Sequence, residues 1–170
     1  MIVCRPARPS DVPALSTVAR HTWSDAFGST VSAEDEAAEL ESTRSEAYFE
    51  TALTSDTILV AEDDGVLVGY VQFGDVEIPE VQPHPEDREL RRLYVESELQ
   101  GQGAGRMLLN AALGHPRLVD AHRIFLEQNE RAIRLYEAAG FRRVGTTAFT
   151  IGSGERVEDV VMMLDRETPR

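Results

Sequence analysis

The sequence predicts a mixed α/β fold, and three observations support this prediction. The N-terminal third has apolar residues at helical spacing, residues 57–73 have the pattern of a β-hairpin, and residues 89–113 read as a strand, a glycine-rich turn and a helix. A hairpin forms an antiparallel pair, whereas a strand that leads through a helix to another strand is typical of parallel pairing. We therefore expect one sheet with both kinds of pairing, flanked by helices.

Two helices are expected before the first hairpin. The first follows Ser10, a residue type that caps helices, and runs to about Asp25, after which Gly28-Ser29 breaks the pattern. Its inner face is expected to carry Leu15, Val18, Ala19 and Thr22. The second helical pattern, from Ala33 to Leu53, is strongly acidic, with Arg44 as its single basic residue. Such a composition is typical of a solvated helix face.

Strands are expected next. Thr57–Ala61 and Val66–Phe73 flank Asp63-Asp64-Gly65, whose residue types suit the positive φ angles of a tight hairpin turn. Residues 75–87 are rich in proline and acidic residues, so we expect an exposed loop that is a candidate rim for a pocket. Glu89–Val95 is then the central strand.

The C-terminal part is expected to contain two helices, a strand and a terminal hairpin. The helix after the central strand should stop at Gly114 and Pro116. The remaining expected elements are a strand at His122–Leu126, a helix at about Asn129–Ala139, and hairpin strands at Phe141–Thr150 and Arg156–Leu164 around a Gly152-Ser153-Gly154 turn.

The size and composition indicate one globular domain. With 170 residues, 42% of them hydrophobic, we expect a single domain over residues 1–170. No segment approaches the roughly 18 apolar residues of a membrane span, and the first residues lack the apolar stretch of a signal peptide. A soluble, cytoplasmic protein without a membrane partner is therefore expected. Cys4 is the only cysteine, so no internal disulfide can form.

The charge and the spacing of the histidines argue against two kinds of site. A net charge of −13 argues against a nucleic-acid partner, whose binding surface needs clustered basic residues, and fits either a small cationic substrate or solubility alone. The four histidines are scattered along the sequence and no Cys/His group has metal-ligand spacing, so no metal is expected. They are His21, His84, His115 and His122.

The glycine-rich turn after the central strand is the strongest functional signal. Gly101, Gly103 and Gly105 remove side chains where a phosphate must approach the backbone, and the following helix directs its N-terminal amides at the anion. A nucleotide-triphosphate loop would end in Gly-Lys-Ser/Thr, but the chain has no lysine. A dinucleotide loop would need the spacing G-x-G-x-x-G, which is absent. The turn therefore predicts a different phosphorylated cofactor.

The run Gln100-Gly101-Gln102-Gly103-Ala104-Gly105 reads Q-x-x-G-x-G and resembles the acyl-CoA loop of the GNAT superfamily of N-acyltransferases. A second resemblance follows downstream, where residues 129–141 match N-x-x-A-x-x-x-Y and end in Gly140-Phe141. The resemblance implies a single-domain GNAT-like α/β fold with a mixed, mostly antiparallel sheet of about six to seven strands, splayed central strands and about four to five helices. It also implies acetyl-CoA as cosubstrate.

The resemblance assigns cofactor contacts to three segments. Main-chain groups of the central strand would bind the pantetheine arm and polarise the thioester. The glycine loop would bind the pyrophosphate. The second motif, which starts at Asn129, would add contacts from that residue and two arginines. The implied cofactor-binding residues are Leu93, Tyr94, Val95, Gln100, Gly101, Gln102, Gly103, Ala104, Gly105, Arg106, Asn129, Arg131 and Arg134. Solvated arginines and a helix-capping asparagine are the alternative interpretations of the last three.

Two residues are candidates for catalysis. An alkyl amine must lose a proton before it attacks a thioester, and Glu89 stands at the family position of the general base. Tyr136 stands at the family position of the acid that protonates the departing thiolate. The alternatives are an exposed acid at a strand end for Glu89 and a core helix residue for Tyr136. One departure from the family is a shorter strand before Asn129, which puts the register of that residue in doubt.

Acceptor selection is expected near the N-terminus and in the terminal hairpin. Trp23, Asp25 and Phe27, with the acidic helix that follows, resemble the bacterial spermine/spermidine N-acetyltransferases. A small-molecule amine, first a polyamine, is therefore the expected acceptor. Acetylation of a protein or peptide amine is the alternative reaction, and a non-catalytic acyl-CoA-binding module is the alternative of another class. Members of the superfamily often form homodimers, which makes a homodimer possible here.

Overall fold

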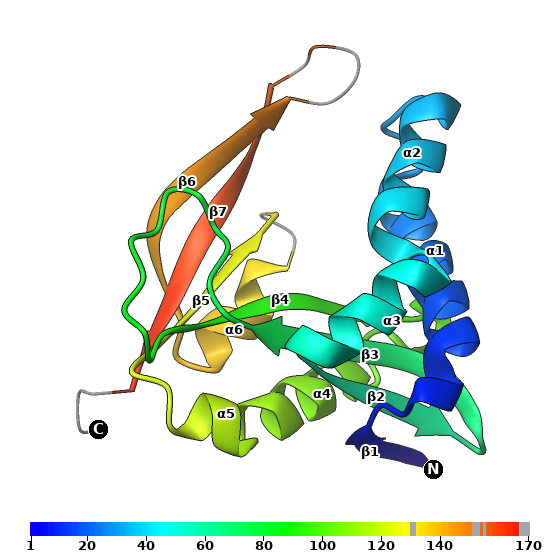
Figure 1. Ribbon diagram of the computed structural model, residues 1–170, viewed down its shortest axis with the longest axis horizontal. Coiled ribbons are helices and arrows are strands. Elements are labelled where there is room, and N and C mark those ends of the chain that lie inside the picture. Colours follow the sequence, from blue (N-terminus) through cyan, green and yellow to red (C-terminus); the bar gives the residue numbers. More distant parts are fainter. Residues whose placement is uncertain (130–131, 151–153, 155, 167–170) are drawn as a thin grey trace. The chain divides into compact units, whose positions relative to one another are not determined.

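Figure 1 shows the computed structural model, which describes residues 1–129, 132–150, 154 and 156–166. The strands are β1 (Ile2–Pro6), β2 (Thr57–Asp63), β3 (Val66–Gly74), β4 (Arg88–Val95), β5 (Arg123–Gln128), β6 (Arg142–Thr150) and β7 (Arg156–Asp165). The helices are α1 (Val12–Phe27), α2 (Ala33–Arg44), α3 (Glu46–Ser55), α4 (Ala104–Leu113), α5 (Pro116–Val119) and α6 (Ile133–Ala138), with short 3₁₀ helices η1 (Pro9–Asp11) and η2 (Ser97–Leu99).

The strands form one seven-stranded sheet in the order β1-β2-β3-β4-β5-β7-β6. The pairs β1–β2, β5–β7 and β6–β7 are antiparallel, and β4 pairs with β5 in parallel. A mixed, mostly antiparallel sheet with flanking helices confirms the fold class that the sequence predicts. Residues 152 and 153 of the predicted terminal turn lie outside the described residues.

The chain divides into two compact units. Unit 1 contains Met1–Gln72 and Arg92–Ala112, and unit 2 contains Phe73–Arg91 and Leu113–Arg170. Strands β3 and β4 begin in one unit and end in the other. The expectation of a single domain over residues 1–170 stays a prediction.

In unit 1, α1 packs against α2 and α3 (Figure 1). The predicted inner face of α1 is confirmed, since Leu15, Val18, Ala19 and Thr22 are all buried. The predicted cap is wrong, because Ser10 lies within η1 and Asp11 occupies the capping position. The Asp11 carboxylate accepts hydrogen bonds of 2.7 and 3.1 Å from Arg5 instead of capping the helix.

The acidic segment predicted as one helix is two helices that meet at Ser45. This residue has extended backbone angles, φ −75° and ψ 164°, and its Oγ accepts a hydrogen bond from the Tyr48 N–H at 3.2 Å. Serine is a strong N-cap because its side chain satisfies an amide that the helix leaves unpaired. This local preference ends α2 and starts α3, although the helical periodicity continues across both.

The hairpin between β2 and β3 has the predicted turn. Asp64 and Gly65 both have positive φ angles, 48° and 85°, as a two-residue hairpin turn of the favoured kind requires. Strand β1 was not predicted, and it pairs with β2 so that Cys4 lies opposite Ala61. Cys4 is partly buried, and burial raises the pKa of its thiol.

Unit 2 is built on β5, β7 and β6, with residues 75–87 packed against them. Ile78 of this segment joins Phe125, Val161 and Met163 in an apolar cluster and is only 4% exposed. Asp87 is also buried and pairs with Arg123 at 2.6 Å. The prediction of an exposed loop is therefore wrong at these two positions, because each finds a partner on β5 or β7 that lies far away in sequence.

Two further boundaries in unit 2 differ from expectation. Pro116 begins the short helix α5 instead of only ending the previous one, in keeping with the preference of proline for the first helical turn. Helix α6 begins at Ile133 and not at Asn129. Among the described residues, no helix is both long and apolar enough to cross a lipid bilayer.

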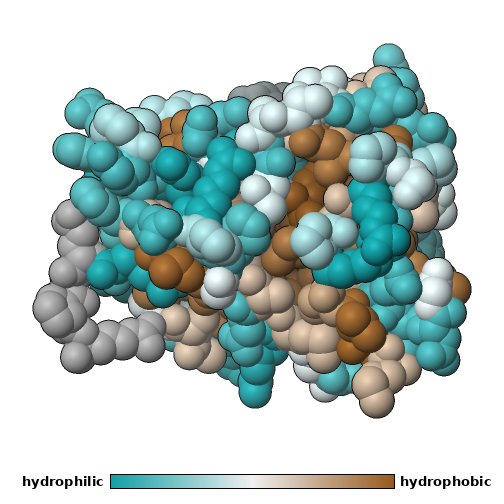
Figure 2. All heavy atoms as spheres, turned by 60° about the horizontal axis from the view of Figure 1, so that its bottom comes forward, coloured by the Kyte–Doolittle hydropathy of each residue, from teal (hydrophilic) through white to brown (hydrophobic). Residues whose placement is uncertain are grey.

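The surface carries scattered apolar side chains. On the face shown in Figure 2, hydrophobic residues interrupt a largely hydrophilic surface. Among the residues that the structure describes, the exposed large hydrophobic ones are Met1, Val3, Val66, Met107, Val119 and Val144. Because folded proteins routinely leave single apolar side chains in water, these residues need no partner to explain them.

Candidate active site

The glycine loop of unit 1 connects η2 to α4. Gly101 and Gly103 have φ angles of 78° and 89°, a left-handed conformation that residues with a side chain rarely adopt. No atom lies within 4 Å of the position that a Cβ would take at either glycine. The first helical hydrogen bond joins the Met107 N–H to the Gly103 carbonyl at 2.9 Å, so the amides just before Met107 are those that the helix leaves unpaired.

Two glutamine side chains fix the shape of this loop. Gln100 Nε2 donates a hydrogen bond to the Val95 carbonyl at 3.2 Å, and Gln102 Nε2 donates to the Glu98 carbonyl at 2.7 Å. Both side chains therefore bind backbone of the same segment. This arrangement holds the loop backbone in place and leaves the amides just before Met107 as the groups that can bind an anion.

The end of β4 packs closely on β3. A Cβ placed on Gly69 would lie 2.7 Å from the Tyr94 carbonyl and 3.2 Å from Val95 Cγ2, so only glycine fits at this point of β3. Val95 is buried, whereas Leu93 and Tyr94 are half-buried. The Glu96 N–H continues the ladder with a 2.9 Å bond to the Val68 carbonyl. These contacts hold the strand that leads into the glycine loop.

Arg44 connects two of the predicted site residues. Its guanidinium lies over the Trp23 ring at 5.3 Å and near the Tyr94 ring at 5.8 Å, and the residue is only 3% exposed. Its Nη1 donates to Glu39 at 2.6 Å and also to Thr43 Oγ1. Burial alone would raise the pKa of Glu39, but its bonds from Thr43 and Arg44 lower it. Sequence reasoning treated Arg44 as one solvated charge and missed this arrangement.

Asp25 and His21 of α1 lie beside the residues that follow β4. Asp25 accepts a 3.3 Å hydrogen bond from Ser97 Oγ, and His21 Nδ1 lies 2.6 Å from Glu96 Oε2. The bond to Glu96 raises the pKa of His21. The rings of Trp23 and Phe27 lie 5.5 Å apart. Unit 1 therefore brings Asp25 to Ser97, which precedes the glycine loop, while Phe27 packs on Trp23.

Glu89 of β4 belongs to unit 2 and is buried, with 5% of its surface exposed. Its Oε2 accepts the Glu77 N–H at 2.6 Å and lies 3.6 Å from Arg91 Nη1. Burial raises the pKa of Glu89, while the Glu77 N–H and the Arg91 charge oppose this effect. The interpretation as an exposed strand-end acid is wrong, because residues 75–87 cover the carboxylate.

Two further carboxylates accompany Glu89 in unit 2. Glu89 lies opposite Phe125, and Glu127 follows two residues later on the same face of β5. Desolvation raises the pKa of Glu127, with added repulsion from Glu89, Asp159 and Glu80, and burial raises the pKa of Asp159. Sequence reasoning missed Glu127 and Asp159. Side chains two residues apart on a strand share a face, so Glu127 lies on the face of Phe125 and Asp159 on the face of Val161. This alternation is the sequence signal that could have found both residues.

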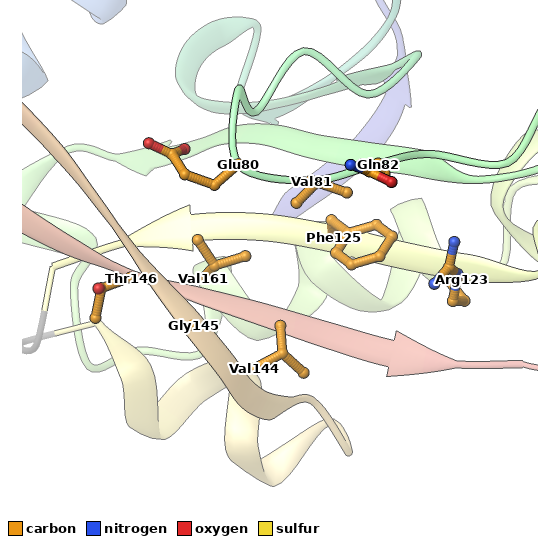
Figure 3. Close-up of a pocket in the computed structure, with 9 residues that line it drawn as sticks. All are labelled: Glu80, Val81, Gln82, Arg123, Phe125, Val144, Gly145, Thr146 and Val161. Atoms are coloured by element: carbon orange, nitrogen blue, oxygen red, sulfur yellow. The ribbon is translucent and has the colours of Figure 1, made fainter.

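A pocket of about 210 Å³ lies on this face of unit 2. Figure 3 shows Glu80, Val81 and Gln82 on one side and residues of β6 on the other, with Phe125 and Val161 between them. Its lining residues are Glu80, Val81, Gln82, Arg123, Phe125, Val144, Gly145, Thr146 and Val161. Residues 75–87 therefore form a rim of a pocket, as their sequence suggested.

The second motif lies in unit 2 beside β5. Tyr136 of α6 is 1% exposed, and its ring packs against Phe141 at 5.9 Å and 72°. Asn129 follows β5, and its carbonyl accepts the Ala132 N–H at 3.2 Å. Arg134 is exposed, and Arg131 lies outside the described residues.

The candidates therefore fall into two groups. The glycine loop, Leu93–Val95 and the N-terminal candidates belong to unit 1, whereas Glu89, Asn129 and Tyr136 belong to unit 2. Strand β4 carries both Glu89 and Leu93–Val95, so the two groups are connected through one strand.

Comparison with known proteins identifies relatives over most of the chain. The model of the Acetyltransferase (GNAT) family matches residues 18–141. The chain is 31% identical to an uncharacterized N-acetyltransferase of Mycobacterium tuberculosis over 159 residues, which cover 91% of this chain and 97% of that protein.

Two characterised relatives have different acceptors in their names. An L-amino acid N-acyltransferase of Escherichia coli is 28% identical, with 79% of this chain and 76% of that protein covered. A spermine/spermidine N(1)-acetyltransferase of Bacillus subtilis is 35% identical over 103 residues, which cover 55% of this chain and 62% of that protein.

Among solved structures, the PaiA N-acetyltransferase of Thermoplasma acidophilum in complex with coenzyme A superimposes with a TM-score of 0.77. The match covers 97% of this chain and 99% of that chain at 21% sequence identity. At this identity the likeness confirms the predicted fold and carries no conclusion about the acceptor.

Proposed function

Because the chain belongs to the GNAT family of acetyltransferases, we propose that it transfers the acetyl group of acetyl-CoA to a primary amine of a small cationic molecule, first a polyamine such as spermidine. In this reaction the neutral amine nitrogen attacks the thioester carbonyl and forms a C–N bond. The C–S bond then breaks, the amine proton leaves to a base, and the CoA thiolate takes a proton. The products are an N-acetylated amine and free CoA.

The glycine loop fits the pyrophosphate of acetyl-CoA. A phosphate can come close to the backbone here because the left-handed glycines have open space beside them. The amides at the start of α4 can then donate hydrogen bonds to it. Gln100 to Arg106 would hold this group, and the backbone of Leu93, Tyr94 and Val95 would hold the pantetheine arm and polarise the thioester carbonyl. Asn129 and the two arginines of the second motif are proposed as additional contacts.

Replacing Gly103 by alanine is expected to weaken CoA binding by at least about tenfold, because the new methyl group occupies the space where the pyrophosphate approaches the backbone. A left-handed alanine also costs about 1–2 kcal/mol of folding stability. Gly65→Ala is the matched control, since Gly65 has a similar φ of 85° and equally open surroundings but lies in the β2–β3 turn. Calorimetric titration with CoA should show weaker binding for Gly103→Ala alone, and equal affinities would contradict the assignment.

Glu89 and Tyr136 are proposed to move the protons. A buried carboxylate with a raised pKa is a better base than an ordinary glutamate, because its pKa lies nearer the pH at which it works. Tyr136 is proposed to protonate the thiolate, and its packing on Phe141 fixes the ring that carries the phenol. A fixed donor matters here because a phenol is a weaker acid than a thiol.

The acidic face of unit 2 is the observation that carries the proposed acceptor. Glu89, Glu127 and Asp159 all have raised pKa values, so the charged form of each is disfavoured where it stands. An ammonium group beside them would reverse this effect by supplying the opposite charge. The adjoining pocket has the apolar side chains of Phe125 and Val161 for the methylene groups of such a ligand. A polycationic amine matches both properties.

The test is release of free CoA thiol from acetyl-CoA with spermidine, a free amino acid and a peptide with an N-terminal amine compared at low salt. Saturable turnover with spermidine, which falls as salt rises, supports the proposal. Turnover with the peptide or the amino acid alone replaces the polyamine with that acceptor. Binding of acetyl-CoA without turnover of any amine favours the non-catalytic module.

Matched variants connect the acceptor to the acidic face. Asp159→Asn should raise the KM for spermidine by about threefold to tenfold, since one unit charge near the surface contributes on the order of 1 kcal/mol. Its neighbour Glu158 is exposed and alternates to the other face of β7, so Glu158→Gln should leave the KM unchanged. Equal effects of the two substitutions would argue against a site on this face.

A further inference from the structure

Residues 84–87 and the residue just before β5 bring two histidines and a glutamate together in unit 2. One ligand atom from each of His84, Glu86 and His122 lies within 4.8 Å of the other two. His84 Nδ1 lies 3.1 Å from Glu86 Oε2, and the rings of His84 and His122 are 6.3 Å apart. Spacing along the sequence does not show this group, because His122 is remote from the other two residues.

The backbone around the three side chains is held by several hydrogen bonds. The His84 N–H donates to Asp87 Oδ2 at 2.7 Å, and the Asp87 N–H donates to the His84 carbonyl at 3.0 Å, which closes a tight turn. The His122 N–H donates to the Glu86 carbonyl at 3.1 Å and joins the turn to β5. Asp87 is itself fixed by Arg123 at 2.6 Å. The group is therefore largely pre-organised before any ligand binds.

We propose that His84, Glu86 and His122 bind a divalent transition-metal ion, with zinc as the expected ion. Two imidazoles and one carboxylate are a common protein ligand set for zinc, which leaves a fourth position for water. With bonds of about 2.0–2.1 Å, the ligand atoms of a tetrahedral site are about 3.4 Å apart. The His84–Glu86 separation already matches this value, and small rotations of exposed side chains close the remaining distances.

The ion would replace a proton in the existing arrangement. The His84 imidazole donates to the Glu86 carboxylate at 3.1 Å. A metal bound to both groups takes the place of the shared hydrogen. The second three-ligand group of the described residues, His21, Asp25 and Glu96, offers a single imidazole, so it is the poorer zinc site.

The consequence of binding is a cross-link between residues 84–86 and the residue just before β5. The same segment supplies Glu80, Val81 and Gln82 to the pocket of unit 2. Metal binding would therefore stabilise one wall of the pocket without contributing to proton transfer. The proposed role is structural, and it is independent of the identity of the amine.

The test is calorimetric titration of the untagged full chain with zinc, followed by thermal unfolding with and without the metal. The parent chain should bind one zinc at this site and unfold at a higher temperature when zinc is present, because a ligand of the folded state stabilises it. His84→Ala and His122→Ala should each weaken binding by at least about tenfold, since loss of even a second-shell partner costs about 10- to 100-fold. Both changes should abolish the thermal shift.

The control is His21→Ala, which removes the imidazole of the other group and should leave zinc affinity and the thermal shift unchanged. Circular dichroism of all variants without metal checks that they fold. A parent chain that binds no zinc overturns the proposal. So does equal affinity in the parent, His84→Ala and His122→Ala chains, or a loss that occurs only in His21→Ala.

Discussion

Glu89→Gln is expected to lower kcat/KM for the amine by about 10²- to 10⁴-fold while the affinity for acetyl-CoA stays within a factor of about two. The carboxylate can accept the proton of the attacking amine, and an uncharged amide cannot. The loss should be greatest where the Glu89 carboxylate is charged, and it should shrink as the pH falls through the raised pKa of Glu89, because the parent then loses its base as well. Steady-state kinetics over a series of pH values, with a separate CoA titration, measures both quantities.

The pH profile distinguishes a base from a structural residue. Burial raises the pKa of Glu89, so the parent enzyme should lose activity as pH falls through that raised value, and the variant should lack this acidic limb. Glutamine keeps an oxygen that can accept the Glu77 N–H, so residues 75–87 remain held in place. Glu77→Gln is the control, because Glu77 shares Arg91 but is exposed. An unchanged rate at every pH, or equal losses in both variants, would remove Glu89 as the base.

Arg44→Met is expected to lower the free energy of unfolding by about 3 kcal/mol, because it breaks an ion pair whose arginine is buried. This value is near the lower end for buried ion pairs, since the partner Glu39 keeps 40% of its side chain exposed. The substitution removes the charge that lies between Trp23 and Tyr94 and the bonds that hold the end of α2. Methionine fills much of the same volume, so the change in the free energy of unfolding comes from lost polar contacts more than from a cavity. Urea denaturation followed by fluorescence of Trp23, the single tryptophan, measures it.

Arg20→Met is the matched control for this prediction. Arg20 also pairs with a glutamate of α2, Glu41, at 3.1 Å, but its side chain is 38% exposed and that of Glu41 is 76% exposed. Pairs of this kind contribute about 0–1 kcal/mol, so the control should lose little. If Arg44→Met cost no more than Arg20→Met, the buried arginine would have no special role in unit 1.

The features that the sequence predicted depend on local chemistry. Asp64-Gly65 specifies its turn because each residue tolerates a positive φ, and Gly101 and Gly103 specify the loop for the same reason. The inner face of α1 follows from a spacing that a helix alone determines. Ser45 shows that a local signal can also be missed, since its capping preference was readable in a segment interpreted as one continuous helix.

The features that escaped prediction depend on contacts between distant residues. Arg44 is buried only because Trp23 of α1 and Tyr94 of β4 meet around it. Strand β1 exists only as a partner of β2, and Glu89 is covered only because Ile78 anchors residues 75–87 to β5 and β7. The catalytic and cofactor assignments come from motif resemblance, and they remain predictions until the variants are measured.

The partly buried thiol of Cys4 also affects how the reaction can be followed. Thiolates, and not thiols, react with disulfide reagents, so a thiol whose pKa is raised by burial reacts slowly. Cys4 is the only cysteine in the sequence, and its strand pairs with β2. A chromogenic disulfide added during turnover should therefore record the released cofactor with little background from the enzyme itself. Under unfolding conditions the same reagent should react with one equivalent per chain and so report the protein concentration in the assay.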